Sequence, residues 1–442
     1  MISSWRRRRA GRGGNKNAEL LNGNLQTEIT IPSLFRCPIS LDLMKDPVTL
    51  PTGITYDREN IERWIEADNQ TCPVTNQVLN SFDQIPNHAL RKMIQDWCVE
   101  NRSYGVERIP TPRVPVTQYD VSGICSRISV STQRGDQKSC LELVGKIKAW
   151  GKESDRNRRC IVNNGTGCVL ADAFHSFASA SIEKHVSLLK EILYVLTWIF
   201  PLGEEGQSEL GSAASLDAMV WLLKSGDLSA RQNVVLVLKG LLSLNQRHVV
   251  ALAQIEGVPE ALVEMIREPI CPKATKASLT AIFYVISPSA ISERFTSRFV
   301  ELGVVSLILE TLVDAEKGIC ERALGVLACI CDSNEGREEA YKNALTMPLL
   351  VKRILRISAL ATEFAVCILW KLCKNDKRDE GGVIVEALQA GVFQKLLVLL
   401  QVGCDEGRKE KVTELLKLLN LHRDRVDCVD SSLDFKYLKR PF

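Results

Sequence analysis

The feature that most constrains the fold of this chain is an apolar pattern that recurs every 43–46 residues over its second half. Five ten-residue segments carry the pattern, and each is followed after 20–22 residues by apolar positions spaced i, i+3, i+4 and i+7, except the last. Two registers that share one period predict repeated helical units. The five segments are Ala214–Leu223, Gly257–Ile266, Gly303–Leu312, Thr346–Leu355 and Gly391–Leu400.

This repeat dictates the architecture of the region that carries it, residues 121–425. One unit of two or three helices cannot bury its own apolar face, whereas stacked units bury a continuous core. A period in this range is typical of HEAT or armadillo repeats, so the sequence predicts a helical solenoid with an extended surface. Glycine permits a tight turn at the start of three segments. A weaker copy near Gly165 and closing helices after Gly403 are also expected.

Composition and charge indicate which kinds of protein this chain can be. Hydrophobic residues make up 45% of the 442 residues and charged residues 25%, and the net charge of +3 does not favour a nucleic-acid binder. Fifteen cysteines are scattered, mostly at apolar helical positions, which is typical of a reducing compartment. The sequence shows no signal peptide and no run of about 20 apolar residues. We therefore expect an intracellular, cytoplasmic protein without a transmembrane segment.

The other segments of the chain precede or follow this predicted solenoid in the sequence. Residues 1–30 are polar and basic and are predicted to be disordered, with an arginine run at Arg6–Arg9. A solvated tail, a nuclear address and a contact with acidic lipid at the membrane surface all stay open for that run. Residues 31–104 form a first compact unit, residues 105–120 a proline-containing linker, and residues 426–442 a charged tail.

Residues 31–76 contain two cysteine-bearing loops, a hairpin and a helix, laid out as in a RING finger. A double zinc site needs about eight Cys or His ligands in closely spaced pairs. Hydrogen bonds and ion pairs, rather than a metal, are therefore expected to fix these loops. The only Cys and His residues between positions 31 and 104, none of them in a C-x-x-C pair, are Cys37, Cys72, His88 and Cys98.

The local pattern predicts the secondary structure of this unit. Residues 48–50 and 54–56 flank a Pro-Thr-Gly turn and are expected to form a hairpin. Asp57 is expected to cap the helix that follows, and Asn87 a second helix. The apolar side of the first helix is formed by Ile61, Trp64 and Ile65.

Four motifs carry a family resemblance: FRCPISLDLMKDPV, GITYDRENIERWI, TCPVTNQ and PNHALRKMIQDWC. Together they resemble the U-box, the metal-free relative of the RING finger. With the helical repeats, the chain is similar to plant U-box/armadillo ubiquitin-protein ligases, and its start MISSWRRRR to the elicitor-induced subgroup. The resemblance implies a mainly α fold: a small α+β U-box, then an armadillo solenoid, without metal or cofactor. It also implies protein ubiquitination, in plant defence or stress signalling.

The resemblance further implies a surface for a ubiquitin-conjugating enzyme charged with ubiquitin. In the family this enzyme binds a shallow groove between the two loops and the helix. Exposed apolar side chains that converge on one patch mark such interaction sites. The alternative to a binding role is ordinary packing within the loop for the loop residues, and a place in the core for the tryptophan. Carried over by motif, the binding residues are Ile39, Leu41, Trp64 and Pro73.

One position departs from the pattern of many such ligases. They carry a cation just after the second loop, which holds ubiquitin in a reactive pose, and the aligned residue here is Asn76. A neutral amide lacks charge assistance, so weaker ubiquitin activation is expected. Family members form no thioester with ubiquitin, so Cys37 and Cys72 are interpreted as buried loop residues and no catalytic residue is assigned.

Polar side chains are expected to take the structural place of zinc in the two loops. For each candidate, a solvated surface position is the alternative. The candidates are Asp42, Arg58, Glu62, Thr75 and Asn87.

Three hypotheses of function follow. The first is a ubiquitin ligase whose solenoid binds the protein substrate, and the second is a non-catalytic scaffold with a degenerate U-box. The third is a transport receptor resembling importins, which use arrays of Trp and Asn; here only Trp221 lies on such a segment, and no Asn ladder follows. The intact set of Ile39, Trp64 and Pro73 favours the first hypothesis, and the oligomeric state stays open.

Overall fold

The computed structural model divides into two compact units, residues 1–114 and 115–442, and each is described by itself. The predicted basic segment, apart from Thr30, lies outside the described residues, as do the three prolines of the predicted linker and the predicted charged tail. The described residues are 30–67, 69–109, 116–287, 292–376, 382–403 and 406–423.

The first unit is built on a small antiparallel sheet with the strand order β2-β1-β3. β1 (Pro47–Thr49) and β2 (Thr55–Asp57) form the predicted hairpin, with each strand shifted by one residue away from the turn. Gly53 has a φ of 82° in that turn, a conformation that glycine adopts without steric cost. The sequence did not predict the edge strand β3 (Ile85–Pro86), which pairs with the other side of β1.

Two helices and two short 3-10 turns complete the first unit. α1 (Arg58–Glu66) follows β2 directly, and α2 (His88–Glu100) follows β3, while η1 (Ser33–Phe35) and η2 (Arg102–Tyr104) lie near its two ends. The core between them contains fully buried side chains from both loops, the hairpin and both helices. These include Cys37, Tyr56, Ile61, Cys72 and Ile94.

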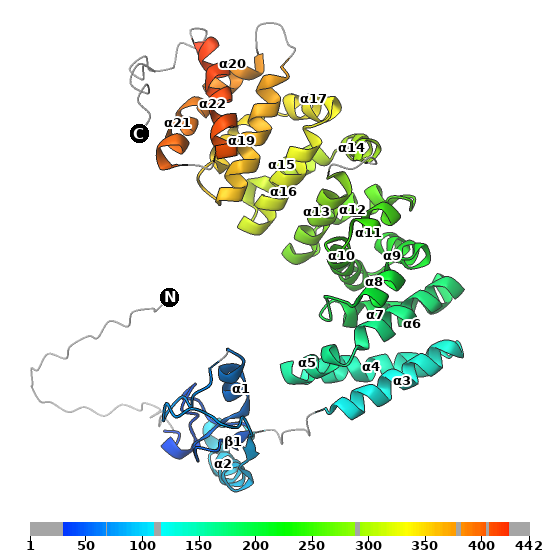
Figure 1. The fold of residues 1–442 in the computed structure, drawn as a ribbon, viewed down its shortest axis with the longest axis vertical. Helices are drawn as coiled ribbons and strands as arrows, with labels where there is room; N and C mark the ends of the chain where they lie inside the picture. The colour runs from blue at the N-terminus through cyan, green and yellow to red at the C-terminus, as the bar shows by residue number, and fades with distance from the viewer. Residues whose placement is uncertain are drawn as a thin grey trace, which may run out of the picture. The chain divides into compact units, whose positions relative to one another are not determined.

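The second unit is a curved stack of helices that runs from α3 (Gln118–Gln133) to α22 (Glu406–Leu421), as Figure 1 shows. Each repeat contains one long helix that packs on the long helix of the next repeat. The predicted second register lies on these helices. Before α22 they are α4 (Gln137–Glu153), α7 (Ile182–Leu196), α10 (Leu228–Leu242), α13 (Pro272–Ile286), α16 (Lys317–Ile330) and α19 (Ala359–Lys374).

Two shorter helices follow each of the six long helices from α4 to α19. The second helix of each pair carries a predicted apolar segment and packs on the next long helix. The pairs are α5 (Asp155–Asn163) and α6 (Thr166–Ala180), α8 (Glu204–Leu210) and α9 (Ala213–Ser225), α11 (Gln246–Leu252) and α12 (Val258–Arg267), α14 (Ser292–Glu301) and α15 (Val304–Asp314), α17 (Asn334–Lys342) and α18 (Thr346–Arg353), α20 (Gly382–Gln389) and α21 (Val392–Val402).

Glycine begins four of these segment helices in the left-handed conformation. The φ values are 69° at Gly165, 80° at Gly257, 78° at Gly303 and 84° at Gly391, and each glycine is the N-cap residue of its helix. A side chain at such a position would be strained, so glycine fixes the sharp entry into the helix. The predicted weaker copy near Gly165 is therefore a complete repeat in the structure.

The solenoid begins earlier than the sequence predicts. Thr117 and Asp120 form a capping box: Thr117 Oγ1 accepts from the Asp120 backbone N–H at 3.2 Å, and Asp120 accepts in return from the Thr117 N–H at 3.0 Å. This reciprocal pair starts α3 at Gln118, inside the predicted linker. One continuous apolar cluster then extends from Val121 to Leu419. Within the part of the chain that is described, no single helix is long and apolar enough to cross a membrane.

Candidate functional site

The first cysteine-bearing loop is closed by its own backbone. The Cys37 N–H donates to the Asp42 carbonyl at 2.8 Å, and the Leu41 N–H donates back to the Cys37 carbonyl at 2.8 Å. An isolated bridge between Arg36 and Leu43 closes the base of the loop. Leu41 has a φ of 63°, which is strained for a leucine, and its side chain is 66% exposed. The closed loop thus holds an aliphatic side chain out into solvent.

The second loop repeats the first bond for bond. The Cys72 N–H donates to the Gln77 carbonyl at 2.8 Å, and the Asn76 N–H donates to the Cys72 carbonyl at 2.9 Å. A bridge between Thr71 and Val78 closes its base, and Asn76 has a φ of 55°, at the place that Leu41 takes in the first loop. Asparagine tolerates this conformation better than leucine does. The two loops are therefore structural copies of one Cys-Pro turn.

Each cysteine sulfur receives hydrogen bonds that tie its loop to the rest of the unit. Cys37 Sγ accepts from the Asp57 N–H at 3.3 Å and from the Asn60 amide at 3.5 Å. Cys72 Sγ accepts from the Tyr56 hydroxyl at 3.0 Å and from the Thr52 hydroxyl at 3.4 Å. Both thiols are fully buried, so these contacts replace the solvent that a polarisable sulfur would otherwise meet.

The donors around Cys72 also change its acidity. Burial raises the pKa of this thiol, but hydrogen bonds from Thr52, Thr75 and Tyr56 outweigh that effect and lower the pKa to about 6. Burial, together with the bond to Cys72, raises the pKa of Tyr56, which therefore stays protonated and donates. The second loop is thus centred on a sulfur that favours the thiolate form at neutral pH.

Helix α1 connects the two loops from its two ends. Near its start, the Asn60 amide donates to Ser40 Oγ of the first loop at 3.0 Å. Near its end, Trp64 Nε1 donates to the Thr71 carbonyl at the base of the second loop at 2.8 Å, and Asn69 donates to the Trp64 carbonyl at 3.0 Å. The loops are therefore held on either side of one helix.

The predicted docking residues occupy these two loops and the helix between them. Ile39 and Pro73 are half-buried, Leu41 is exposed, and Trp64 is half-buried against the core of the unit. The indole bond to the Thr71 carbonyl gives Trp64 a structural role in addition to any contact with a partner. Its replacement is therefore expected to perturb the fold as well as docking.

Val74 is a surface residue that the sequence interpretation missed. It is 51% exposed and stands in the second loop where Ile39 stands in the first, because Cys37-Pro-Ile and Cys72-Pro-Val occupy matching positions. Its backbone N–H donates to the Tyr56 hydroxyl at 3.3 Å, which fixes its position. The repeated Cys-Pro-aliphatic pattern was the signal that could have identified it.

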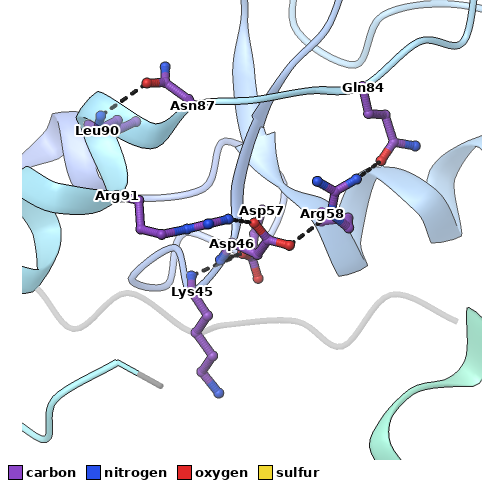
Figure 2. A network of polar contacts seen from close by, with 8 residues as sticks. All are labelled: Lys45, Asp46, Asp57, Arg58, Gln84, Asn87, Leu90 and Arg91. Atoms are coloured by element: carbon purple, nitrogen blue, oxygen red, sulfur yellow. Dashed lines mark hydrogen bonds and ion pairs between the residues drawn. The ribbon is translucent and has the colours of Figure 1, made fainter. Parts of the chain in front are cut away.

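Asp46 is the centre of the polar network that joins the sheet to both helices, as Figure 2 shows. Its carboxylate accepts from Arg58 Nε at 2.8 Å and from the Arg91 guanidinium, and Arg58 donates further to Gln84 Oε1 at 3.3 Å. All three charged side chains are at most 22% exposed, so they are shielded from solvent screening. The sequence interpretation placed Arg58 in this network but did not include Asp46.

Asp57 precedes α1 as predicted, but its side chain does not cap the helix. Its carboxylate instead accepts from the backbone N–H groups of Lys45 at 2.9 Å and Asp46 at 2.7 Å. Burial raises the pKa of Asp57, and the bond from Lys45 partly offsets that effect. The prediction of a cap was therefore wrong, because the two donors of the preceding loop lie within reach of the carboxylate.

The other predicted network residues contribute in different ways. Asn87 caps α2, accepting from the Leu90 N–H at 3.0 Å, and its amide lies 3.4 Å from the hydroxyls of Thr49 and Thr55. Thr75 donates to the Cys72 thiol inside the second loop. Asp42 is exposed and closes its loop through the backbone carbonyl, and Glu62 is half-buried on α1.

The described residues contain no group of three or more His, Cys, Asp or Glu side chains that could hold a metal ion. The positions of the loop cysteines show why this is so. Each of them meets hydroxyl and amide donors, where a zinc site would bring further thiolate or imidazole ligands.

Comparisons with known proteins agree with this arrangement. Residues 31–103 match the family model of the U-box domain, and residues 120–439 match that of the plant U-box protein ARM repeat region. The chain belongs to the plant U-box armadillo-repeat family. It is 49% identical over 418 residues to U-box domain-containing protein 21 and 50% identical over 425 residues to U-box domain-containing protein 20, both from Arabidopsis thaliana. Each match covers 94% of both chains.

A more distant relative carries an activity in its name. The chain is 34% identical over 426 residues to E3 ubiquitin-protein ligase PUB22 of Arabidopsis thaliana, a match that covers 89% of this chain and 95% of the relative. The predicted fold class, a small U-box followed by an armadillo solenoid, is confirmed.

Proposed function

We propose that this U-box protein is a ubiquitin-protein ligase that recruits a ubiquitin-charged conjugating enzyme to its paired loops. One observation carries the proposal: two copies of a Cys-Pro turn, tied to the two ends of α1, contain the half-buried Ile39 and Pro73 and the exposed Leu41. Relatives named as ubiquitin-protein ligases, which align along almost the whole chain, support it. Apolar anchors of this kind dominate the energy of protein interfaces.

The proposed mechanism needs no covalent intermediate on this chain. Cys37 and Cys72, the two cysteines of the loops, are fully buried, so neither offers a nucleophile to an incoming ubiquitin. The contribution of the ligase is positional, because holding a reactive thioester near a substrate amine lowers the barrier by removing the entropic cost of their encounter. The attacking group is a substrate lysine.

The solenoid is proposed to bind the protein substrate. Its stacked helices offer an extended surface, and such surfaces are the usual binding faces of repeat proteins. A role in plant defence or stress signalling stays a prediction that comes from the family resemblance. A cytoplasmic location stays a prediction that comes from the cysteine pattern and the composition.

The test is discharge of ubiquitin from a charged conjugating enzyme in the presence of the full chain. Ile39→Ala is expected to reduce the discharge rate about tenfold or more, because it removes a central anchor from the interface. Leu34→Ala is the matched control: Leu34 is an aliphatic side chain of η1 and is 61% exposed. Wild-type activity of Ile39→Ala would show that the docking surface lies elsewhere.

A substitution at Asn76 distinguishes a weakly active ligase from a scaffold that binds the charged enzyme without accelerating discharge. Asn76→Arg is expected to raise the discharge rate several-fold, because a guanidinium adds charge-assisted hydrogen bonds to the bound ubiquitin. The control is Gln77→Arg, which adds the same charge at the next exposed position. If the wild-type protein and Asn76→Arg both bind the charged enzyme without accelerating discharge, the scaffold hypothesis is favoured instead.

A further inference from the structure

The long helices in the middle of the solenoid differ in charge from the shorter helices between them. α10, α13, α16 and α19 together contain eight Lys or Arg residues and only two acidic residues, a net charge of +6. The six shorter helices from α11 to α18 contain eight basic and nine acidic residues, a net charge of −1. Summed over these repeats, the basic excess thus lies on the long helices, although the whole chain is only +3.

The long helices form one layer of the stack. α10 packs on α13, α13 on α16 and α16 on α19, so the long helices adjoin from one repeat to the next. In Figure 1, α16 lies on the inner side of the bend, whereas α14 and α17 lie on its outer side. Positions three, four and seven residues apart share one side of a helix, which places Lys276 with Phe283, and Arg322 with Gly325.

Several cations of this layer have no acidic partner among the residues that the structure describes. Lys239 and Lys276 are exposed and Arg322 is half-buried, and none of the three makes an ion pair with a described residue. Other cations of the layer are already used between repeats, as in the pair of Lys371 with Asp332 at 2.5 Å and that of Lys374 with Glu414 at 2.9 Å. The unpaired cations therefore leave positive charge available to a ligand.

An aromatic pair lies among these cations. Phe283 of α13 and Phe364 of α19 meet edge to face across α16, with ring centroids 6.4 Å apart. They meet there because the intervening position is Gly325, where an added Cβ would lie 3.3 Å from the Phe364 ring and 3.4 Å from the Phe283 ring. Both rings are half-buried, so each keeps an exposed part that can contact an apolar group of a ligand.

From these observations we infer that the long-helix face of α10, α13, α16 and α19 binds an acidic protein segment that carries a bulky apolar side chain. Lys239, Lys276 and Arg322 attract the carboxylates of the segment, and the Phe283–Phe364 pair contacts its apolar side chain. The occupant follows from charge complementarity, since the layer contains four times as many basic as acidic residues. The inference deepens the proposed function, because it names the chemistry of the substrate that the solenoid is proposed to hold.

The first experiment selects binders from a random peptide library on the immobilised full chain. The recovered peptides are expected to be rich in Asp and Glu and to contain Leu, Phe or Trp. The affinity of the best peptide is expected to fall with added salt, because the cations are exposed. Recovery of neutral or basic peptides, or of none, would overturn the inference.

The second experiment locates the binding face with charge reversals. The triple variant Lys239→Glu, Lys276→Glu and Arg322→Glu is expected to weaken binding of the selected peptide about tenfold or more. The matched control reverses three exposed cations on the shorter helices, Arg247→Glu, Arg294→Glu and Lys352→Glu, which changes the net charge equally. Equal weakening by both triple variants would mean that only the net charge of the protein matters, and would overturn the proposed face.

Two further arms complete the test. Phe364→Ala is expected to remove the preference for a bulky apolar residue in a repeated selection while the acidic preference stays. A single-stranded RNA oligonucleotide is the competing ligand, since exposed cations and aromatic rings also suit nucleic acid; displacement of the peptide by RNA at equal concentration would assign the face to nucleic acid instead. Discharge of ubiquitin by the U-box is measured separately, so its failure would contradict the proposed function without affecting the peptide result.

Discussion

The two units of this protein are stabilised in contrasting ways. The solenoid buries one apolar cluster that passes from repeat to repeat, so each side chain supplies a small share of a distributed core. The U-box unit has a much smaller core, and its loops depend on individual polar contacts with a few shared acceptors, Asp46, Cys37 and Cys72. A single polar substitution is therefore expected to reduce stability far more in the U-box unit than in the solenoid.

The largest difference in lost stability is expected between the alanine substitutions of two aspartates, one in each unit. Asp46→Ala leaves two shielded guanidinium groups without their shared carboxylate and is expected to cost about 3 kcal/mol. Asp332→Ala breaks an inter-repeat pair with Lys371 in which the carboxylate is 62% exposed, and Lys371 keeps its bond to the Ala328 carbonyl at 2.7 Å. This change is expected to cost about 0.5 kcal/mol.

Hydrogen exchange followed by mass spectrometry measures both changes in the full chain. Asp46→Ala should accelerate exchange in β1, α1 and α2, whereas Asp332→Ala should leave α16 and α19 protected. Comparable losses of protection in the two variants would remove the contrast between the units.

A pH-dependent effect is expected at Cys72. Because its folded pKa of about 6 lies below the unfolded value of 9.0, the thiolate adds stability above about pH 9, and this contribution declines as the pH falls towards 6. Cys72→Ser lacks the thiolate, so the stability gap between wild type and this variant should widen as the pH rises from 6 to 9. Pulse proteolysis in urea, with cleavage read within residues 36–79, measures that gap. A gap independent of pH would mean that Cys72 is a neutral thiol in the folded protein.

A smaller loss of stability than that of Asp46→Ala is expected at the repeated glycine cap of the solenoid. Gly303→Ala forces alanine to a φ of 78° in otherwise open space and is expected to cost about 1 kcal/mol. Gly303→Asn is the control, since asparagine tolerates this conformation, and it should cost less. Thermal unfolding of the full chain measures both variants. Equal losses would show that the space around position 303, rather than the backbone angle, limits substitution.

Much of the fold could be predicted because its signals are local in the sequence. The 43–46-residue period marks the repeats, and the glycines at positions 257, 303 and 391 mark the starts of their segment helices. The hairpin was predicted to within one residue for a similar reason, since Pro51, Thr52 and Gly53 form a compact turn.

The parts that escaped prediction depend on residues far apart in the chain. Asp46 meets Arg58 and Arg91, which lie 12 and 45 residues later, and nothing in the local sequence distinguishes it from the exposed Asp42. Asp57 has the local pattern of a cap, but the backbone donors of an earlier loop bind its carboxylate. The basic layer likewise becomes visible only when helices about 45 residues apart are placed side by side.

Because both loops are attached to α1, that helix sets the distance between them. Asn60 and Trp64, which hold the two loops, are four residues apart and so stand roughly one turn, or about 6 Å, from each other along the axis. Inserting a single residue between them would turn one attachment point by about 100° relative to the other. The spacing and relative rotation of the two loops are thus set by the backbone of α1. The side chains of the loops can change without altering that spacing.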